Sequence, residues 1–222
     1  MNHWNRTLRR ILMYVLGLFF MSIGISMSIQ AGFGVSPVSS LAYASTLTIS
    51  LSVGVTMVLA NILYIIIQVL LSKRMEFNEL ISQFIISFLF GFFMDATLYL
   101  VQLFPTPETI FVRSVYLIVS LFVIAVGLMG YTTAKLPLMP YDALTYAISE
   151  KFNLKFGKAK ILSDVINICV AGIICIVFIQ SLGSIGIGTL ISAYCIGKIL
   201  GWMIPYYQPT LHRWVFKTEK VA

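Results

Sequence analysis

The chain has 222 residues, of which 59% are hydrophobic and only 10% are charged, and its mean hydropathy is +0.95. A soluble domain carries about 25% charged residues and could not bury this much apolar surface, so the composition excludes a soluble globular protein. The net charge of +7 does not predict a nucleic-acid partner, because the basic residues stand at the ends of apolar runs and form no patch.

Six apolar runs are long enough to cross a bilayer, which takes about 20 residues of helix. They predict membrane-spanning helices near residues 9–32, 53–72, 79–103, 112–133, 161–181 and 185–206. The first run follows Arg6, Arg9 and Arg10 as a signal peptide would, but it outlasts the apolar core of a signal peptide, so we expect a retained helix. The spans and their connections use nearly the whole chain, so residues 1–222 are predicted to form a single membrane domain.

Two shorter segments, residues 38–50 and 141–152, begin just after Pro37 and Pro140. Proline is favoured in the first turn of a helix, and both segments are too short to span the bilayer. We expect them to be half-helices that are re-entrant or interfacial. The predicted fold class is therefore an all-α integral membrane protein with about six transmembrane helices and two Pro-initiated half-helices.

Lysine and arginine are distributed unevenly over the loops between the predicted spans. The loops at 33–52, 104–111 and 182–184 contain neither residue type. The basic residues gather before the first span, after the second, between the fourth and fifth, and after the sixth. They are Arg6, Arg9, Arg10, Lys73, Arg74, Lys135, Lys151, Lys155, Lys158, Lys160, Arg213, Lys217 and Lys220. Because positively charged loops stay inside during insertion, both termini are predicted to be cytoplasmic in a cell membrane.

An internal repeat connects the two halves of the sequence at a single offset of 103 residues. Seven identities share it: Gly24/Gly127, Ala31/Ala134, Pro37/Pro140, Leu41/Leu144, Tyr43/Tyr146, Ala44/Ala147 and Gly54/Gly157. Asn61 meets Asp164 at the same offset, and Gly91 meets Gly197 after a three-residue shift. The predicted repeats, about 9–103 and 112–207, each hold three spans. An odd number of spans reverses the second repeat, which predicts the inverted topology typical of many secondary transporters.

The segment from Gly24 to Gly54, GISMSIQAGFGVSPVSSLAYASTLTISLSVG, leads from a Gly-rich helix end into a Pro-started short helix. Its second copy keeps a Pro-x-Asp pattern at Pro140 and Asp142. In these features the chain resembles the YczE/YyaS/YitT family of bacterial integral membrane proteins, over essentially its whole length and closer to the YczE side, without a C-terminal soluble domain. The resemblance implies a six-span bacterial inner-membrane protein. The first copy departs from it, with Ser39 where a carboxylate is common.

Ionisable groups at membrane depth cost several kcal/mol unless they are paired or hydrated, so they are candidates for function. The sequence places Asp95 well inside the third predicted span, Asp164 one turn into the fifth and Lys198 within the sixth. Asp95 and Lys198 occupy related regions of the two repeats and could form a buried pair, either functional or structural. Asp164 could instead be interfacial.

The starts of the two half-helices are the second kind of candidate site, because a helix N-terminus offers unbonded N–H groups and a positive dipole. Ser36 and Ser39 add hydroxyl groups to the first start, whereas Asp142 adds a carboxylate to the second, where it either caps the helix or meets a cation. The pair Tyr43 and Tyr146 either faces a site or anchors the chain at the membrane surface. The last candidate substrate-binding residue is Asn61.

The sequence contains no nucleophile–base set, paired carboxylates or metal-ligand spacing, so we expect no catalytic residues, metal or cofactor. The leading hypothesis is a transporter of a small polar or amphiphilic molecule, with its site at the interface of the two repeats. One alternative is a membrane-embedded substrate-binding subunit that needs an energising partner, and another is a non-transporting accessory protein. The expected partners are the lipid bilayer, a small-molecule ligand, and a second copy or another membrane subunit.

Overall fold

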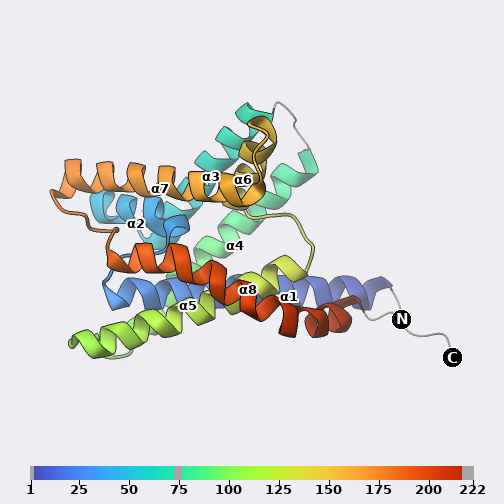
Figure 1. Cartoon of the computed structure of the whole chain (residues 1–222), viewed down its shortest axis with the longest axis horizontal. Coiled ribbons are helices and arrows are strands. Elements are labelled where there is room, and N and C mark those ends of the chain that lie inside the picture. Colours follow the sequence, from blue (N-terminus) through green and yellow to red (C-terminus); the bar gives the residue numbers. More distant parts are fainter. Residues whose placement is uncertain (1–2, 73–76, 217–222) are drawn as a thin grey trace.

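A computed structural model of the protein describes residues 3–72 and 77–216, and over these residues the chain is all-helical, with no strand (Figure 1). The eight described helices are α1 His3–Ala31, α2 Pro37–Ile49, α3 Val53–Ser72, α4 Phe77–Gln102, α5 Ile110–Thr133, α6 Pro140–Lys151, α7 Phe156–Ile179 and α8 Ile187–Phe216. Six of them, all but α2 and α6, are long and apolar enough to cross a membrane. The predicted fold class, with six long helices and two short ones, is confirmed.

The ends of α8 differ from the prediction, because the helix continues through Pro205 and Pro209 to Phe216 instead of stopping near 206. Proline inside a helix removes a hydrogen bond, so the extension needs support from elsewhere. The start of α1 supplies it. Arg9 donates from Nη1 to the carbonyl oxygen of Trp214 at 3.1 Å, and Val215 is fully buried. Tertiary packing, which local sequence does not reveal, keeps the last turns helical.

The two short helices form as predicted, each with proline in its first turn after an extended residue, Ser36 and Met139 respectively. Proline suits this position because its fixed φ is helical and its missing N–H would have no partner there. α2 ends at Ile49, and the next residue, Ser50, caps it: its φ of +55° lies in the left-handed region, and its N–H donates to the carbonyl oxygen of Thr46.

α1 and α5 pack closely along one another with α8 beside them, and α2, α3, α6 and α7 lie together on one side of this group (Figure 1). Glycine permits the close approach, since a Cβ on Gly17 would lie 2.4 Å from the backbone nitrogen of Tyr131. α4 packs on α1, and α8 packs on α5. The short helices pack across the halves of the chain, because α2 lies along α7 and α6 lies along α3.

The outward faces of the long helices are apolar and exposed, as faces in contact with lipid would be. Four of the basic residues used to predict the orientation, Lys73, Arg74, Lys217 and Lys220, lie outside the described residues. The cytoplasmic location of the termini therefore stays a prediction.

Candidate functional site

Two carboxylates and one lysine of the second half meet where α6 begins beside α7. Lys160 Nζ lies 3.8 Å from Asp142 Oδ1 and 3.4 Å from Asp164 Oδ1. Asp142 stands in the first turn of α6, where the helix dipole favours an acid. Lys160 and Asp164 are one turn apart and share a face of α7. All three side chains are partly exposed, by 18% to 30%, and together they carry one formal negative charge in excess.

Two tyrosines orient these carboxylates. Tyr131 donates to Asp142 Oδ2 at 3.0 Å and accepts a hydrogen bond from the backbone N–H of Met139 at 2.9 Å. Tyr141 donates to Asp164 Oδ1 at 2.5 Å, and the ammonium of Lys160 lies 4.1 Å from the centre of the Tyr141 ring. The ammonium thus meets two carboxylates and an aromatic face, which is the chemistry that recognises organic cations. These five residues, Tyr131, Tyr141, Asp142, Lys160 and Asp164, are called the α6–α7 cluster below.

Tyr141 lies on α6, outside the six membrane-spanning helices. Burial raises the pKa of its phenol well above the ordinary value, and the negative charge of Asp164 raises it further. The phenol therefore stays protonated at neutral pH and remains a hydrogen-bond donor to the carboxylate. This keeps the Asp164 oxygen in a fixed position.

The cluster is connected to the start of the other short helix through buried polar groups. The rings of Tyr141 and Tyr64 meet edge to face, with centroids 5.2 Å apart. Tyr64 donates to Asn167 Oδ1 at 2.8 Å, and Asn167 Nδ2 donates to the carbonyl oxygen of Pro37 at 2.6 Å. Tyr64 and Asn167 are each 4% exposed. One chain of contacts therefore joins the first turn of α2 to the first turn of α6.

The corresponding residues of the first half are buried and neutral. Ser36 and Ser39 are bonded to each other, with their hydroxyl oxygens 2.8 Å apart. Asn61 is 2% exposed, and its side-chain Nδ2 has no hydrogen-bond partner in the structure. An unpaired buried amide costs about 1–3 kcal/mol of folding free energy. The side chain of Asn61 therefore destabilises the folded protein unless another group bonds to its Nδ2. It lies one turn before Tyr64 on α3, and this spacing places it on the same helix face.

Asp95 lies apart from the cluster, at the crossing of α4 and α3. Its Oδ2 accepts a hydrogen bond from the hydroxyl of Ser52 at 2.7 Å, and its Oδ1 accepts one from the backbone N–H of Gly54 at 2.7 Å. A carboxylate at the first turn of a helix satisfies an N–H group that has no partner within the helix. The half-buried Asp95 therefore caps α3 from a neighbouring helix.

Lys198 does not meet Asp95. Its side chain is exposed, and its ammonium lies 4.4 Å from the centre of the ring of Tyr194 on its own helix. The pair that the sequence allowed is thus not formed. Tyr43 is half-buried on α2, whereas Tyr146 is 48% exposed on α6 and stacks against Phe156 with ring centroids 4.4 Å apart.

Sequence reasoning missed five residues of the cluster and the contact chain: Lys160, Tyr131, Tyr141, Tyr64 and Asn167. The four-residue spacing between Lys160 and Asp164 is a signal in the sequence, because residues four apart share a helix face. Asn167 stands 103 residues after Tyr64, at the offset of the internal repeat. The tyrosines look like ordinary apolar-run residues until the fold brings them to the carboxylates.

Within residues 3–72 and 77–216, no three His, Cys, Asp or Glu side chains come together in the way that metal ligands do. The α6–α7 cluster offers oxygens held in place by tyrosines, and it lies at the junction of several helices. Membrane proteins often place ligand sites in such junctions.

Comparison with known proteins gives the family. Residues 8–205 match a family described as a family of unknown function, DUF6198. The chain belongs to this DUF6198 family. It is 27% identical over 200 residues to the uncharacterized protein YyaS of Bacillus subtilis (strain 168), covering 90% of this chain and 92% of the relative. It is 20% identical over 201 residues to an uncharacterized protein of Haemophilus influenzae, covering 90% and 86%. This agrees with the YyaS-related family suggested by the half-helix motifs, and no solved structure matches the DUF6198 chain.

Proposed function

We propose that this DUF6198 protein is a membrane transporter of a small polar or amphiphilic molecule, with its site at the interface of two inverted repeats. The observation that carries the proposal is the contact chain from Pro37 through Asn167 and Tyr64 to the α6–α7 cluster. It joins the first turns of both short helices inside an apolar helical assembly. Sites of secondary transporters are built in this way, from interrupted or short helices whose ends meet at the repeat interface.

Mirrored contacts between α1 and α5 support the inverted repeat. A Cβ on Gly24 would lie 2.9 Å from the carbonyl oxygen of Ser120 and 2.8 Å from the nitrogen of Ile124. A Cβ on Gly127 would lie 2.7 Å from the carbonyl oxygen of Gly17 and 2.5 Å from the nitrogen of Met21. Gly127, Ser120 and Ile124 each follow their counterparts Gly24, Gly17 and Met21 by 103 residues. Contacts that exchange in this way are the signature of a two-fold relation.

The polar contact chain has the same property. The repeat offset of 103 residues relates Tyr64 to Asn167 and Val38 to Tyr141. The ring contact between Tyr64 and Tyr141 therefore corresponds to the contact between Asn167 and Val38. Tyr64 and Asn167 are themselves counterparts and are bonded to each other. A residue that contacts its own counterpart lies close to a two-fold axis. The proposed site therefore lies close to the proposed axis, where a rocking motion of the halves would expose it alternately to the two sides.

Transport by the purified protein is the direct test. The protein would be reconstituted into liposomes and exposed to a metabolite extract, and uptake would be followed by mass spectrometry. We expect at least one small metabolite to accumulate with the wild type and to be lost with Asp164→Asn. Glu108→Gln, an acid-to-amide change on the exposed α4–α5 connection, is the matched control and should transport normally.

Two outcomes would contradict the proposal. If the protein binds a metabolite but moves none, and co-purifies with an ATPase, it is a substrate-binding subunit. If it neither binds nor moves any metabolite while folded, an accessory role in another membrane process becomes the better explanation.

A further inference from the structure

Helix packing divides the described residues into two groups of helices, and each group takes members from both halves of the sequence. α1 packs with α5, α4 packs on α1 and α8 packs on α5, whereas α2 lies along α7 and α6 lies along α3. The first set, α1, α4, α5 and α8, is called the α1–α5 group below, and the second, α2, α3, α6 and α7, is called the α2–α7 group. The repeat offset relates α1 to α5, α2 to α6, α3 to α7 and α4 to α8, so each helix and its counterpart belong to the same group.

The α1–α5 group is fastened at both ends by two arginines that are counterparts of each other. At the start of α5, Arg113 Nε donates to the carbonyl oxygen of Ala31, the last residue of α1, at 2.7 Å. Near the start of α1, Arg10 Nε donates to the carbonyl oxygen of Ala134, just after α5, at 3.0 Å. The two donors are 103 residues apart, as are the two acceptors. Each arginine thus satisfies a carbonyl group that has no partner within its own helix, and the two contacts are images of one another.

The α2–α7 group is held together by polar contacts. Tyr64 on α3 donates to Asn167 on α7 at 2.8 Å, and Asn167 donates to the carbonyl oxygen of Pro37 on α2 at 2.6 Å. Tyr141 on α6 donates to Asp164 on α7 at 2.5 Å. These bonds join all four helices of the group, which also supplies four of the five residues of the α6–α7 cluster. The candidate site therefore belongs mainly to this group.

The two groups pack on each other through α3 and α4, and this contact has no image in the second half. A Cβ on Gly54 would overlap the backbone of α4, and Asp95 accepts hydrogen bonds from Ser52 and from the N–H of Gly54. The image of this contact would join α7 to α8, but in the described part of the chain these helices do not pack along one another. A Cβ on Gly157 or on Gly197 would meet no atom within 4 Å.

We propose that the two groups move against one another as rigid bodies between this conformation and its image, in which α7 packs on α8 and α3 separates from α4. The main contacts within the groups occur in image pairs, so they survive the exchange, whereas the contact between the groups is broken on one side and formed on the other. The proposal rests on the inverted repeat of the proposed function and names the bodies that rock. Each body is built from both halves of the sequence, and the exchange gives the candidate site access to the two sides of the membrane in turn.

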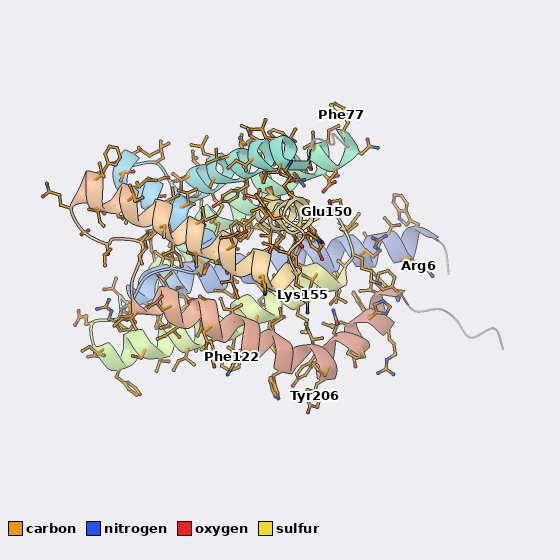
Figure 2. All side chains as sticks on the ribbon, turned by 45° about the horizontal axis from the view of Figure 1, so that its top comes forward. Arg6, Phe77, Phe122, Glu150, Lys155 and Tyr206 are labelled. Atoms are coloured by element: carbon orange, nitrogen blue, oxygen red, sulfur yellow. The ribbon has the colours of Figure 1, made fainter. Side chains whose placement is uncertain are left out.

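The residues at the two places predict which conformation predominates. In the α3–α4 contact, the carboxylate of Asp95 accepts hydrogen bonds from Ser52 and from the start of α3. Their counterparts 103 residues later are Lys198 and Lys155, and Figure 2 labels Lys155, which immediately precedes α7. The image contact brings two positive charges to a helix N-terminus, where the helix dipole is also positive. We therefore expect the described conformation to predominate.

The test is crosslinking of paired cysteines in cell membranes, in a chain whose native cysteines are replaced by serine. Ser52→Cys with Asp95→Cys probes the α3–α4 contact, and Lys155→Cys with Lys198→Cys probes its image. A short bifunctional methanethiosulfonate is added, and the crosslinks in each chain are counted by intact mass. We expect both pairs to crosslink, the first faster than the second, and a chain with all four cysteines to carry one crosslink or the other but never both. Ser52→Cys with Lys198→Cys belongs to neither contact and is the control that should not crosslink.

A second variant shifts the population instead of trapping it. Lys155→Ser with Lys198→Asp recreates the bonded pair of the first half at the start of α7. Added to the chain with cysteines at positions 52 and 95, it should slow the first crosslink by about fivefold, the effect of one helix cap on a two-state equilibrium. Lys151→Asp with Lys158→Ser, the same charge change at two other exposed lysines, is the matched control and should leave the rate unchanged.

The proposal is overturned if the image pair crosslinks no more than the control pair, if chains with both crosslinks accumulate, or if the recreated cap leaves the first crosslink as fast as before. Crosslinking needs no substrate, so its outcome is separate from that of the transport test. Exclusive crosslinks in a protein that transports nothing would support this inference and contradict the proposed function. Transport by a protein whose image pair never crosslinks would support the proposed function and contradict this inference.

Discussion

Two pairs of glycines at corresponding places in the halves differ in their surroundings. The pair Gly54 and Gly91 is called the first crossing below, and the pair Gly157 and Gly197 the second crossing. In the first half, α3 and α4 touch through glycines: a Cβ on Gly54 would lie 2.2 Å from the carbonyl oxygen of Gly91. Gly157 and Gly197 stand at the corresponding positions of α7 and α8, and neither would find an atom within 4 Å of an added Cβ. Figure 1 shows α7 and α8 near one another at their connection and spreading apart toward the start of α7. Glycines at corresponding positions therefore accompany a close helix contact in the first half and open space in the second.

The charges at the two crossings also differ. Asp95 and Ser52 cap the N-terminus of α3, where the helix dipole attracts an anion. The first turn of α7 contains no acid, its capping position is held by Lys155 without a side-chain cap, and Lys158 follows. The start of α7 therefore carries lysines and no side-chain cap, whereas the start of α3 is bonded to a carboxylate of the helix that it contacts.

The interior positions of α3 and α7 show the opposite asymmetry. Lys160 and Asp164 form an ion pair on α7, whereas their counterparts 103 residues earlier, Met57 and Asn61, are neutral and buried. The first half thus has its carboxylate at the crossing, and the second half has its ion pair at positions where the first half is neutral and buried. The first asymmetry can be tested by adding a methyl group at each crossing, and the second by introducing a charge into the first half.

The largest expected effect comes from Asn61→Asp, which introduces a charge at a position that is 2% exposed. A buried charge without a partner costs about 3–5 kcal/mol, so the melting temperature in detergent should fall by about 10 °C or more. Adding Met57→Lys, which recreates the i, i+4 pair of α7, should recover part of the loss. Asn78→Asp, the same change at an exposed site in the first turn of α4, is the control. A stable Asn61→Asp protein would mean that the interior of the first half already tolerates charge.

The second-largest expected effect on stability comes from adding a single methyl group at each crossing. Gly54→Ala places a Cβ against the backbone of α4, and such overpacking costs about 1–3 kcal/mol. Gly157→Ala meets open space and should be neutral or slightly stabilising, because alanine favours helix over glycine. Thermal unfolding of the two variants in parallel measures the difference. Equal losses would show that α7 and α8 also close on each other in the membrane.

Much of this architecture was predictable because the signals are local. The apolar run lengths predicted six spans, and Pro37 and Pro140 predicted the two short helices within a residue of their observed starts. The extension of α8 to Phe216 was not predictable, because it depends on contacts with Arg9 at the other end of the chain. Sequence periodicity describes one helix at a time and carries no information about such a partner.

The candidate site was predictable only as a set of separate residues. Asp95 and Asp164 were predicted because burying a charge is costly, and Asp142 was predicted because it stands at a helix start. Only the fold shows that Asp95 lies apart from the other two. Lys160 joins Asp142 and Asp164 because α6 and α7 pack together, a contact between elements. The contribution of Tyr141 depends on its reaching Asp164, 23 residues away. The repeat offset carried part of this information, since it pairs Asn61 with Asp164.

A smaller effect is expected for Asp95→Asn. The amide can still accept the hydrogen bond from Gly54 but loses the charge that favours the start of α3, at a cost of about 1 kcal/mol. Ligand binding and transport should survive, because the bonded partners of Asp95 are at the α3 start and not in the cluster. Stability and uptake would be measured on the same preparation. Loss of uptake with unchanged stability would return Asp95 to the substrate site, as the sequence first suggested.

The last prediction involves no loss of stability and decides whether the two crossings open to opposite sides of the membrane. Asp95 lies toward the end of α4, so the first crossing is near the α4–α5 connection that contains Thr106. The second crossing is near the start of α7, just after the exposed Phe152. One span, α5, separates these two connections. With the native cysteines replaced by serine, an impermeant maleimide should label Thr106→Cys from outside the cell and Phe152→Cys only in inside-out vesicles. Labelling of both from one side would place the two crossings on the same side of the membrane and would contradict the inverted relation between the halves.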